Sequence, residues 1–512
     1  MRFALFLYMK YFVCLFILLP NVVYAQKQDY IWVSGDSNDS STTEHGGIII
    51  DFNQMPVKSY YKYRKINMFV CNASICDTAG NLLFYTNGCD IAGPDDEILQ
   101  NGDTINPGWP HQLHCFDYND GYASGIQSAL ALALPMNDTS YYLFHKSYII
   151  KNNPIDVVTN KLLYSTINAS HNTTSVVNKN VELINDELAF GELIAVKQAN
   201  GLDWWVITPK RNSSTFYLFN FTKNGIVDTF QQTIGIQPAP QGEGYGQIVF
   251  SPDGSKLYRT NPRNPIMVYS FDREAGAFTQ FDTIHYEYGN QPVIGEIGCA
   301  VSPNGRFLYL ACRRILYQLD LWAPDISSTQ TVVAEWDGFA DPFPTHFWQC
   351  QLGPDCKIYI RAGGDTRYFH VIHNPDEPGL ACNVEQRGLP LPTPSGASMP
   401  SFPNYRLGPL DNPGLPCSPI VSVSDPVAAR PTVLVYPNPA SEQATFVWPE
   451  AAIGENHLLL FNSLGQPVRD LRLGGSEGTY TLRVADLQAG VYFWAVSGED
   501  GSRLGAGKIV KQ

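Results

Sequence analysis

The chain has 512 residues, of which 16% are charged and 12% aromatic, and its formal net charge is −14 at pH 7. Its length exceeds what one hydrophobic core supports, so we expect two or more domains, and its few charges and many aromatic side chains favour an all-β protein over a disordered chain. The acidic balance argues against a nucleic-acid partner, because binding to phosphates needs a basic surface.

Residues 1–25 have the pattern of a signal peptide. Two basic residues flank a short apolar run over residues 11–19, and small or aliphatic residues precede Ala25. We therefore predict cleavage after Ala25 and export of the mature chain. The apolar run is too short to span a membrane, and Cys14 lacks the small residues that precede a lipidated cysteine. The mature chain is thus expected to have no transmembrane span.

Ten of the 11 cysteines remain after this cleavage, and an even number in an exported chain is consistent with disulfides. Cys350 and Cys356 flank a turn and are candidates to bridge a hairpin. Cys382 and Cys417 are candidates to tether the following linker to the main domain. The sequence does not fix the pairing. Without any CxxC pair, a structural zinc site is not expected.

A hairpin recurs along the main part of the chain. The clearest copies are GQIVFSPDGSKLYRT, GCAVSPNGRFLYLAC and CQLGPDCKIYIRAG, whose turn prolines are 51 residues apart. Each consists of an apolar strand, a turn containing proline, and a second alternating strand. Weaker copies lie near residues 77, 137 and 200. Repeats of this length with about four strands each are typical of a β-propeller.

The two ends of this region are expected to meet. The N-terminal strands predicted at 30–34, 47–52 and 59–63 lack a preceding innermost strand. Residues 398–407 are predicted to form a strand without a partner. If these residues supply the missing strand, the ring closes with seven blades and leaves no open sheet edge. Six or eight blades remain alternatives.

A proline-rich stretch then separates a small C-terminal unit. Residues 409–431 contain six prolines and read as a stiff, extended linker. Short alternating strands after it predict a small Ig-like antiparallel β-sandwich. The predicted order is a signal peptide (1–25), a β-propeller (26–408), a linker (409–431) and a sandwich (432–512).

Both parts resemble known families. The propeller hairpins resemble WD40-like repeats with an SPDG turn, as in periplasmic TolB-type propellers, and SPNGRFLYLAC also looks like a hairpin of seven-bladed lactonase-type propellers. Through DTAGNLLFYTNG, KQANGLDWWVITP and FHVIHNPDEPG, the propeller also resembles secreted propellers of Bacteroidota. The tail resembles the type A C-terminal sorting domain of the Bacteroidota type IX secretion system, through Tyr436, Pro437, Asn438, Pro439, Gly490, Val491, Tyr492, Gly507, Lys508 and Lys511.

The resemblance of the tail implies a route out of the cell. It implies that an outer-membrane translocon reads the tail and that a surface peptidase removes it. The remainder would then be released or attached to the cell surface. An Ig-like adhesive or carbohydrate-binding module is the alternative for the tail, since sandwiches host many functions.

Polar residues at the start of the innermost strands are the candidate ligand-binding site at the channel mouth. They are Gln127, Glu192, Glu243, Glu296 and His346. Three acids at one opening repel each other, and a cation such as calcium, or a ligand rich in hydroxyls or amines, would relieve that repulsion. Alternatively, a wet funnel mouth tolerates these polar ends without any ligand.

Other motifs are weaker. The spacing of His111 and His114 suggests a metal site, but we expect a loop there and not the helix that such spacing needs. Residues 36–40 begin like a calcium loop and are interpreted as a turn. The GxSxG pattern at 474–478 lacks a following helix. Two aromatic pairs are interpreted as core rather than as sugar-stacking surfaces: Trp204 with Trp205, and Phe347 with Trp348.

Two functions from different classes follow. The first is a surface-exposed or secreted propeller that binds a glycan or another surface protein without turnover, or serves as a scaffold. The second is a lactonase-like hydrolase with a cation at the acid-lined mouth. The sequence favours the first and identifies no catalytic residue.

Overall fold

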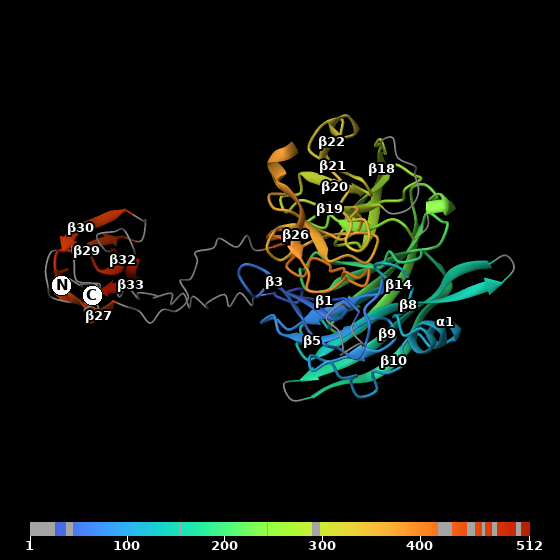
Figure 1. Ribbon diagram of the computed structural model, residues 1–512, viewed down its shortest axis with the longest axis horizontal. Coiled ribbons are helices and arrows are strands. Elements are labelled where there is room, and N and C mark those ends of the chain that lie inside the picture. Colours follow the sequence, from blue (N-terminus) through green and yellow to red (C-terminus); the bar gives the residue numbers. More distant parts are fainter. Residues whose placement is uncertain are drawn as a thin grey trace, which may run out of the picture. The chain divides into compact units, whose positions relative to one another are not determined.

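The computed structural model describes residues 26–36, 45–152, 155–170, 173–242, 244–288, 297–417, 433–447, 456–462, 466–473, 479–497 and 503–512. The chain divides into two compact units, residues 1–420 and 421–512, which are described separately (Figure 1). The predicted signal peptide, most of the predicted linker and the GxSxG pattern lie outside the described residues. Among the described helices, none has the length and apolar character of a membrane span.

In the described residues of the first unit, seven antiparallel sheets follow one another along the chain. The first two have three strands each: β1 (Ile31–Ser34), β2 (Ile48–Asp51) and β3 (Lys58–Tyr61), then β4 (Ala73–Cys76), β5 (Leu82–Thr86) and β6 (Ile91–Ala92). The third consists of β7 (Ala129–Ala133), β8 (Ser140–Asn152), β9 (Ile155–Ser170) and β10 (Thr173–Leu188), and its last three strands are the longest in the described residues.

The remaining four sheets have four strands each. They are β11 (Ile194–Lys197), β12 (Trp204–Pro209), β13 (Thr215–Thr222) and β14 (Gly225–Thr233); β15 (Ile248–Phe250), β16 (Lys256–Arg259), β17 (Ile266–Asp272) and β18 (Ala277–Ile284); β19 (Gly298–Val301), β20 (Phe307–Cys312), β21 (Ile315–Asp320) and β22 (Thr331–Glu335); and β23 (Cys350–Leu352), β24 (Ile358–Ile360), β25 (Tyr368–Ile372) and β26 (Val384–Pro390). The helical segments are short: α1 (Trp109–His111), η1 (Gln112–Asp117), η2 (Pro240–Gly242), η3 (Ser327–Thr329) and η4 (Gly379–Cys382).

The predicted repeat hairpins form, and their turns show why the motif recurs. In the β15–β16 turn, the carboxylate of Asp253 accepts hydrogen bonds from the hydroxyl of Ser251 (2.5 Å) and the amide of Ser255 (3.0 Å). Gly254 follows with φ +74°, a conformation that favours glycine. Asn304 and Gly305 repeat this arrangement between β19 and β20. The local sequence therefore specifies each hairpin by itself.

The sheets pack face to face in cyclic order. Buried apolar clusters join consecutive sheets through the series. The seventh sheet then packs against the first, where Trp32 of β1 meets Tyr359 of β24 edge to face, with ring centroids 5.5 Å apart. Sheets repeated around an axis in this way have β-propeller architecture, as the repeat predicts.

Residues 398–407 were predicted as a strand, and this prediction is wrong. They form no ladder with a neighbouring strand. Pro400 and Pro403 lack the amide hydrogens that a ladder requires, which gives a physical reason.

The segment nevertheless runs beside β1, antiparallel to it. At one end the hydroxyl of Ser34 donates to the carbonyl of Ser398 (2.6 Å). At the other end the guanidinium of Arg406 donates to the carboxylate of Asp29 (2.8 Å). Between them Phe402 packs into the cluster that joins the seventh sheet to the first. The segment thus lies where an innermost strand would be and is held by side chains.

The last residues of this segment and those after it cross one end of the channel. The side chain of Asn404 donates to the carbonyl of Pro252 (3.0 Å), and the hydroxyl of Tyr405 donates to the carbonyl of Ala131 (2.7 Å). The amide of Leu410 donates to the carbonyl of Ala199 (3.0 Å). These three carbonyls belong to the fifth, third and fourth sheets. Residues 404–410, which we call the plug, therefore close this end.

The disulfides differ from both predicted pairs. Cys356 pairs with Cys417, and Cys89 pairs with Cys115. Cys350 and Cys382 are buried free thiols within one apolar cluster, and Cys350 is therefore turned away from its predicted partner, Cys356. Cys417 tethers the end of the first unit to the propeller, but its partner is Cys356 in the β23–β24 turn and not Cys382.

The second unit contains two antiparallel sheets. One consists of β27 (Leu434–Tyr436), β28 (Gln443–Val447) and β31 (Thr479–Arg483). The other consists of β30 (Pro467–Leu473), β29 (Asn456–Phe461), β32 (Gly490–Ser497) and β33 (Arg503–Lys511). Both contribute to one core, in which Phe446 and Trp494 meet edge to face at 5.4 Å. This is a two-sheet β unit, and its Ig-like topology stays a prediction.

The buried ion pair at the plug predicts a stability difference. Replacing Arg406 with Gln leaves Asp29 buried without its partner, so unfolding free energy should fall by about 3–5 kcal/mol. The matched control, Arg367→Gln, disrupts a more exposed pair with Asp341 at 4.0 Å and should cost about 0–1 kcal/mol. Urea denaturation of the mature chain measures both. Equal losses would contradict a structural role for the plug.

Candidate functional site

The sorting motifs are brought together around the last strand of the second unit. The side-chain amide of Asn438 donates to the carbonyl of Lys508, and its oxygen accepts from the amide of Val510, both at 2.9 Å. Ala440 continues this contact, with its amide donating to the carbonyl of Val510 at 2.8 Å. The segment containing Tyr436, Pro437, Asn438 and Pro439 therefore holds β33 by one edge.

The other edge of β33 is held by the second motif. Gly490, Val491 and Tyr492 in β32 pair with the end of β33, and Trp494 pairs with Gly507. A Cβ at Gly507 would lie 2.8 Å from the Trp494 ring, which explains why a glycine stands there. All ten predicted motif residues thus lie on β33 or in the segments that flank it, although they are up to 75 residues apart in the sequence.

This part of the sandwich also has an apolar outer face. Tyr492 and Trp494 point into the core, whereas Val491 and Phe493, which alternate with them along β32, are 42% and 50% exposed. Alternation along a strand places these two side chains on the opposite face.

The predicted mouth residues of the propeller have separate partners. Gln127 exchanges two hydrogen bonds with the backbone of Ile248, at 2.8 and 2.9 Å. Glu192 is buried against Arg259, with an ion-pair distance of 2.6 Å. Glu243 and Glu296 lie outside the described residues. The charge of Glu192 is therefore already compensated, and the ligand role of these residues stays a prediction.

His346 lies in a cationic environment. Its Nδ1 accepts a hydrogen bond from Nε of Arg313 (3.4 Å), and its ring packs on Trp336. Burial lowers the pKa of His346 to about 4, with Arg313 and Arg314 adding to the effect. The imidazole is therefore neutral near pH 7.

Glutamine side chains cross the channel between sheets that are not neighbours. Gln127 precedes the third sheet and reaches the fifth. Gln247 precedes the fifth sheet and donates to the carbonyl of Cys350 in the seventh (2.6 Å). The same side chain accepts from the amides of Cys299 (3.2 Å) and Cys350 (3.0 Å). The channel interior is thus occupied by hydrogen-bonded amides.

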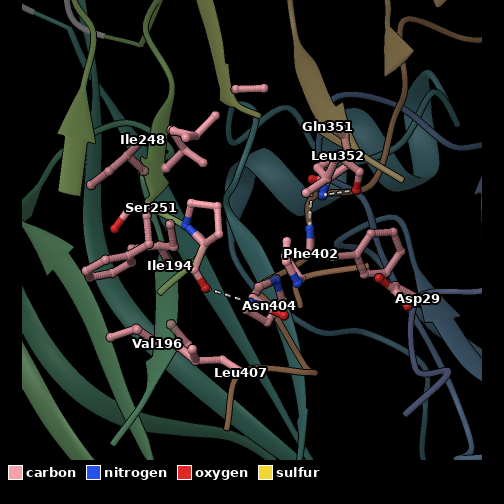
Figure 2. A pocket seen from close by; sticks show the side chains of 18 of the residues that line it. Asp29, Ile194, Val196, Ile248, Ser251, Gln351, Leu352, Phe402, Asn404 and Leu407 are labelled. Atoms are coloured by element: carbon pink, nitrogen blue, oxygen red, sulfur yellow. Dashed lines mark hydrogen bonds between the residues drawn. The ribbon is translucent and has the colours of Figure 1, made fainter. Parts of the chain in front are cut away.

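A small cavity remains between these glutamines and the plug. Figure 2 shows Ile194, Val196, Ile248, Phe402 and Leu407 around it, with Asn404 bonded across its edge. Its volume is about 80 Å³. Pockets that hold a small molecule are typically about 300–1,000 Å³, so this cavity is too small for an organic ligand.

A larger groove of about 670 Å³ lies beside the long third sheet. Its wall includes Trp109, whose side chain is 59% exposed. Its floor carries neutral amides and one compensated ion pair, Lys161 with Glu182 at 2.6 Å. The groove is lined by Pro107, Trp109, Pro110, Ser147, Tyr148, Ile150, Asn152, Asn160, Lys161, Leu163, Asn180 and Glu182, among others. No local sequence pattern indicates this groove, because its walls come from distant segments.

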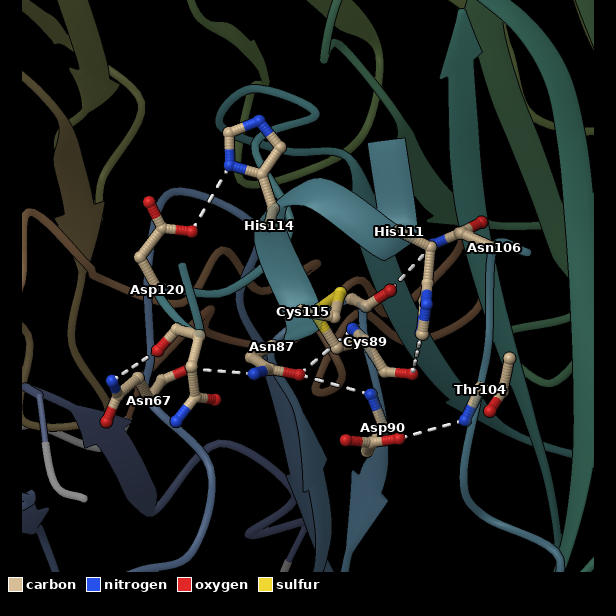
Figure 3. The surroundings of a disulfide bond; sticks show 12 residues. Asn67, Asn87, Cys89, Asp90, Thr104, Asn106, His111, His114, Cys115 and Asp120 are labelled. Atoms are coloured by element: carbon tan, nitrogen blue, oxygen red, sulfur yellow. Dashed lines mark hydrogen bonds and ion pairs between the residues drawn. A yellow bond between two sulfur atoms is a disulfide. The ribbon is translucent and has the colours of Figure 1, made fainter. Parts of the chain in front are cut away.

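The helical segment with Trp109 is fixed by the Cys89–Cys115 disulfide (Figure 3). We expected a loop here, and the structure corrects this to α1 followed by the π-helical turn η1. The rings of His111 and His114 nonetheless point apart in Figure 3. His111 lies 3.4 Å from the carbonyl of Cys89, and His114 lies 3.2 Å from the carboxylate of Asp120. The two histidines therefore form no shared metal site.

The two aromatic pairs are in the core, as predicted. Trp204 and Trp205 are buried in clusters on opposite faces of the fourth sheet. Phe347 is buried in the cluster that joins the sixth and seventh sheets. Trp348 is also buried and stacks beneath Arg361, whose guanidinium carbon lies 4.4 Å from the ring centroid.

Residues 434–512 match the family of the Secretion system C-terminal sorting domain. A tail of this family directs its chain to the type IX secretion machinery, and thus to secretion or attachment at the cell surface. The predicted export route and localisation are confirmed by this match.

The other comparisons are distant. No curated protein matches the chain. A protein of Bacteroides fragilis provisionally described as a 6-phosphogluconolactonase is 13% identical, with 60% of this chain and 94% of that chain covered and a TM-score of 0.27. The β-propeller domain of Cps50 (Swd1) from Myceliophteria thermophila is 10% identical, with coverages of 62% and 87% and a TM-score of 0.32. Apo AztD from Citrobacter koseri is 10% identical, with coverages of 78% and 96% and a TM-score of 0.26.

The two hydrogen bonds between Asn438 and β33 predict how a variant of Asn438 is exported. Asn438→Ala removes both hydrogen bonds to the last strand, so the amount of protein reaching the surface or medium should fall several-fold. The matched control is Gln443→Ala, at an exposed position of β28, which should be exported normally. Immunoblots of periplasm, surface and medium measure the distribution. Normal export of Asn438→Ala would show that this contact is not needed for sorting.

Proposed function

We propose that this chain is an exported, non-enzymatic binding protein, carried to the cell surface or medium by its C-terminal sorting domain. The observation that supports this best is the closed channel. Glutamines cross its interior, the plug covers one end, and Glu192 at the mouth is already paired. A hydrolase acting at the mouth would need carboxylates that are free to hold a cation or a proton.

The proposed assembly is a ring of seven blades, one for each sheet of the first unit, from residues 26 to 408. The linker would span residues 409–431, and the detachable module would be Ig-like and span residues 432–512. By the resemblance to Bacteroidota proteins, a sorting peptidase would remove this module after translocation.

The groove beside the third sheet is the proposed binding site, and a neutral glycan is its proposed ligand. The exposed ring of Trp109 offers a flat apolar surface on which a sugar can stack. Asn152 and Asn160 offer side-chain amides, which both donate and accept hydrogen bonds as sugar hydroxyls require. The groove contains no uncompensated charge among its described residues, because Lys161 and Glu182 neutralise each other.

A lactonase-like hydrolase is the alternative function. It would act at the channel mouth with a calcium ion, and it predicts loss of activity when Glu192 becomes Gln. For a binding protein, Glu192→Gln should lower thermal stability, because the buried ion pair between Glu192 and Arg259 is lost, and should leave glycan binding unchanged.

The glycan proposal predicts a specific loss on changing one tryptophan. Trp109→Ala should weaken binding to neutral polysaccharides by at least about fivefold, since one stacked aromatic contributes about 1–3 kcal/mol. Trp322→Ala is the matched control, because Trp322 is similarly exposed, at 65%, but lies outside the groove. Affinity electrophoresis against a panel of polysaccharides measures both. Binding that survives in Trp109→Ala, or no binding by the wild type, would refute the proposed site.

A further inference from the structure

Three metal-binding side chains meet at the junction between the first and seventh sheets. Asp36 follows β1, His45 precedes β2, and Asp365 lies in the β24–β25 connection. Their ligand atoms all lie within 4.8 Å of one another. We propose that they bind a divalent transition-metal ion, which fastens the last sheet of the ring to the first. This site is independent of the proposed glycan groove.

The two carboxylates are positioned by one turn of the chain. The amide of Gly35 donates to the carbonyl of Ser395 (2.9 Å), and the amide of Ser395 donates to the carbonyl of Thr366 (2.9 Å). The next amide, that of Gly396, donates to the carboxylate of Asp365 (2.7 Å). Hydrogen bonds of this kind orient ligands around a metal. Gly35 and Thr366, which are the chain neighbours of the two aspartates, are thus both bonded to Ser395.

Gly396 leaves no room between its backbone and the site. Its φ is +65°, and a Cβ there would lie 2.9 Å from Oδ1 of Asp36 and 2.7 Å from the carbonyl oxygen of Met68. A residue other than glycine would displace the carboxylate. The close approach of the backbone therefore confines Asp36 to its position opposite Asp365.

A buried hydroxyl beside the cluster has no hydrogen-bond partner in the described part of the chain. It belongs to Ser395, whose side chain is fully buried. The backbone of Ser395 is bonded to the residues that precede Asp36 and follow Asp365. Buried hydroxyls are almost always paired, so an unpaired one between these segments points to a missing group. A water bound to the metal would supply it.

The electrostatics favour a bound cation. Asp36 and Asp365 bring two carboxylates together at partly buried positions, with ligand atoms within 4.8 Å of each other. The guanidinium of Arg64 is bonded to the carbonyls of Ile48 and Gly35. A divalent cation between the two carboxylates would remove the cost of keeping them charged.

The ligand set indicates the class of metal. One imidazole and two carboxylates, with a fourth position open to water, suit Zn²⁺ or Mn²⁺. Ca²⁺ prefers six to eight oxygen ligands and is less suited to an imidazole. Asp36 and His45 lie at the two ends of the connection between β1 and β2 in the first sheet, whereas Asp365 belongs to the seventh sheet. A metal ion bound by all three would therefore stabilise ring closure.

The test uses the tag-free mature chain, freed of metal by a chelator and dialysed. Titration calorimetry with Zn²⁺, Mn²⁺ and Ca²⁺ should show one equivalent of Zn²⁺ or Mn²⁺ bound and little Ca²⁺. The melting temperature should rise on addition of the bound metal, as for any ligand that binds only the folded state. No saturable binding of Zn²⁺ or Mn²⁺ would overturn the proposal.

Variants separate this site from adventitious binding. Asp365→Asn and His45→Ala should each weaken metal binding at least about 100-fold, beyond the effect of losing an outer-shell partner. Without metal, Asp365→Asn should be as stable as the wild type, because it removes one of two repelling charges, so lost binding would not reflect misfolding. His373→Ala is the control, since His373 pairs with Glu385 at 2.7 Å elsewhere on the seventh sheet. Unchanged binding in Asp365→Asn, or an equal loss in His373→Ala, would refute the assignment.

Discussion

A ring of sheets is stable only when its last member covers the exposed face of its first, because a sheet with one apolar face must bury that face against another layer. Here the cluster around Trp32 and Tyr359 provides that cover. Residues 398–407 complete it without forming a strand, since their prolines cannot join a ladder. Closure therefore depends on side-chain contacts: Phe402 in the apolar cluster, and Arg406 in its buried pair with Asp29.

The same closure leaves little free space along the axis. Once Gln127 and Gln247 bond across the channel and the plug covers one end, the remaining cavity is too small for an organic ligand. A groove large enough for a ligand lies on the outside, beside the extended third sheet, where a disulfide fixes the segment containing Trp109. The propeller thus serves as a rigid frame for a peripheral groove.

In the sorting domain, the motif residues gather around the last strand, β33. A domain of this family directs its chain to the secretion machinery, and several of its motif residues also hold β33 in place. Asn438 bonds to one edge of this strand, and Gly507 makes room for Trp494 on the other. The signal is therefore both a set of residues and a particular fold of the chain's end, which leaves Val491 and Phe493 on the outer surface.

The sequence by itself determined what is local. The turn around Asp253 and Gly254 specifies its own hairpin, so the repeat and the propeller could be predicted, and the contiguous sorting motifs could be read as an export address. Only the tertiary structure decided the disulfide partners, the groove around Trp109, the pairing of Glu192 with Arg259 and the meeting of Asp36 with Asp365. These contacts join segments tens to hundreds of residues apart, and no local pattern encodes a distance that exists only after the ring has closed.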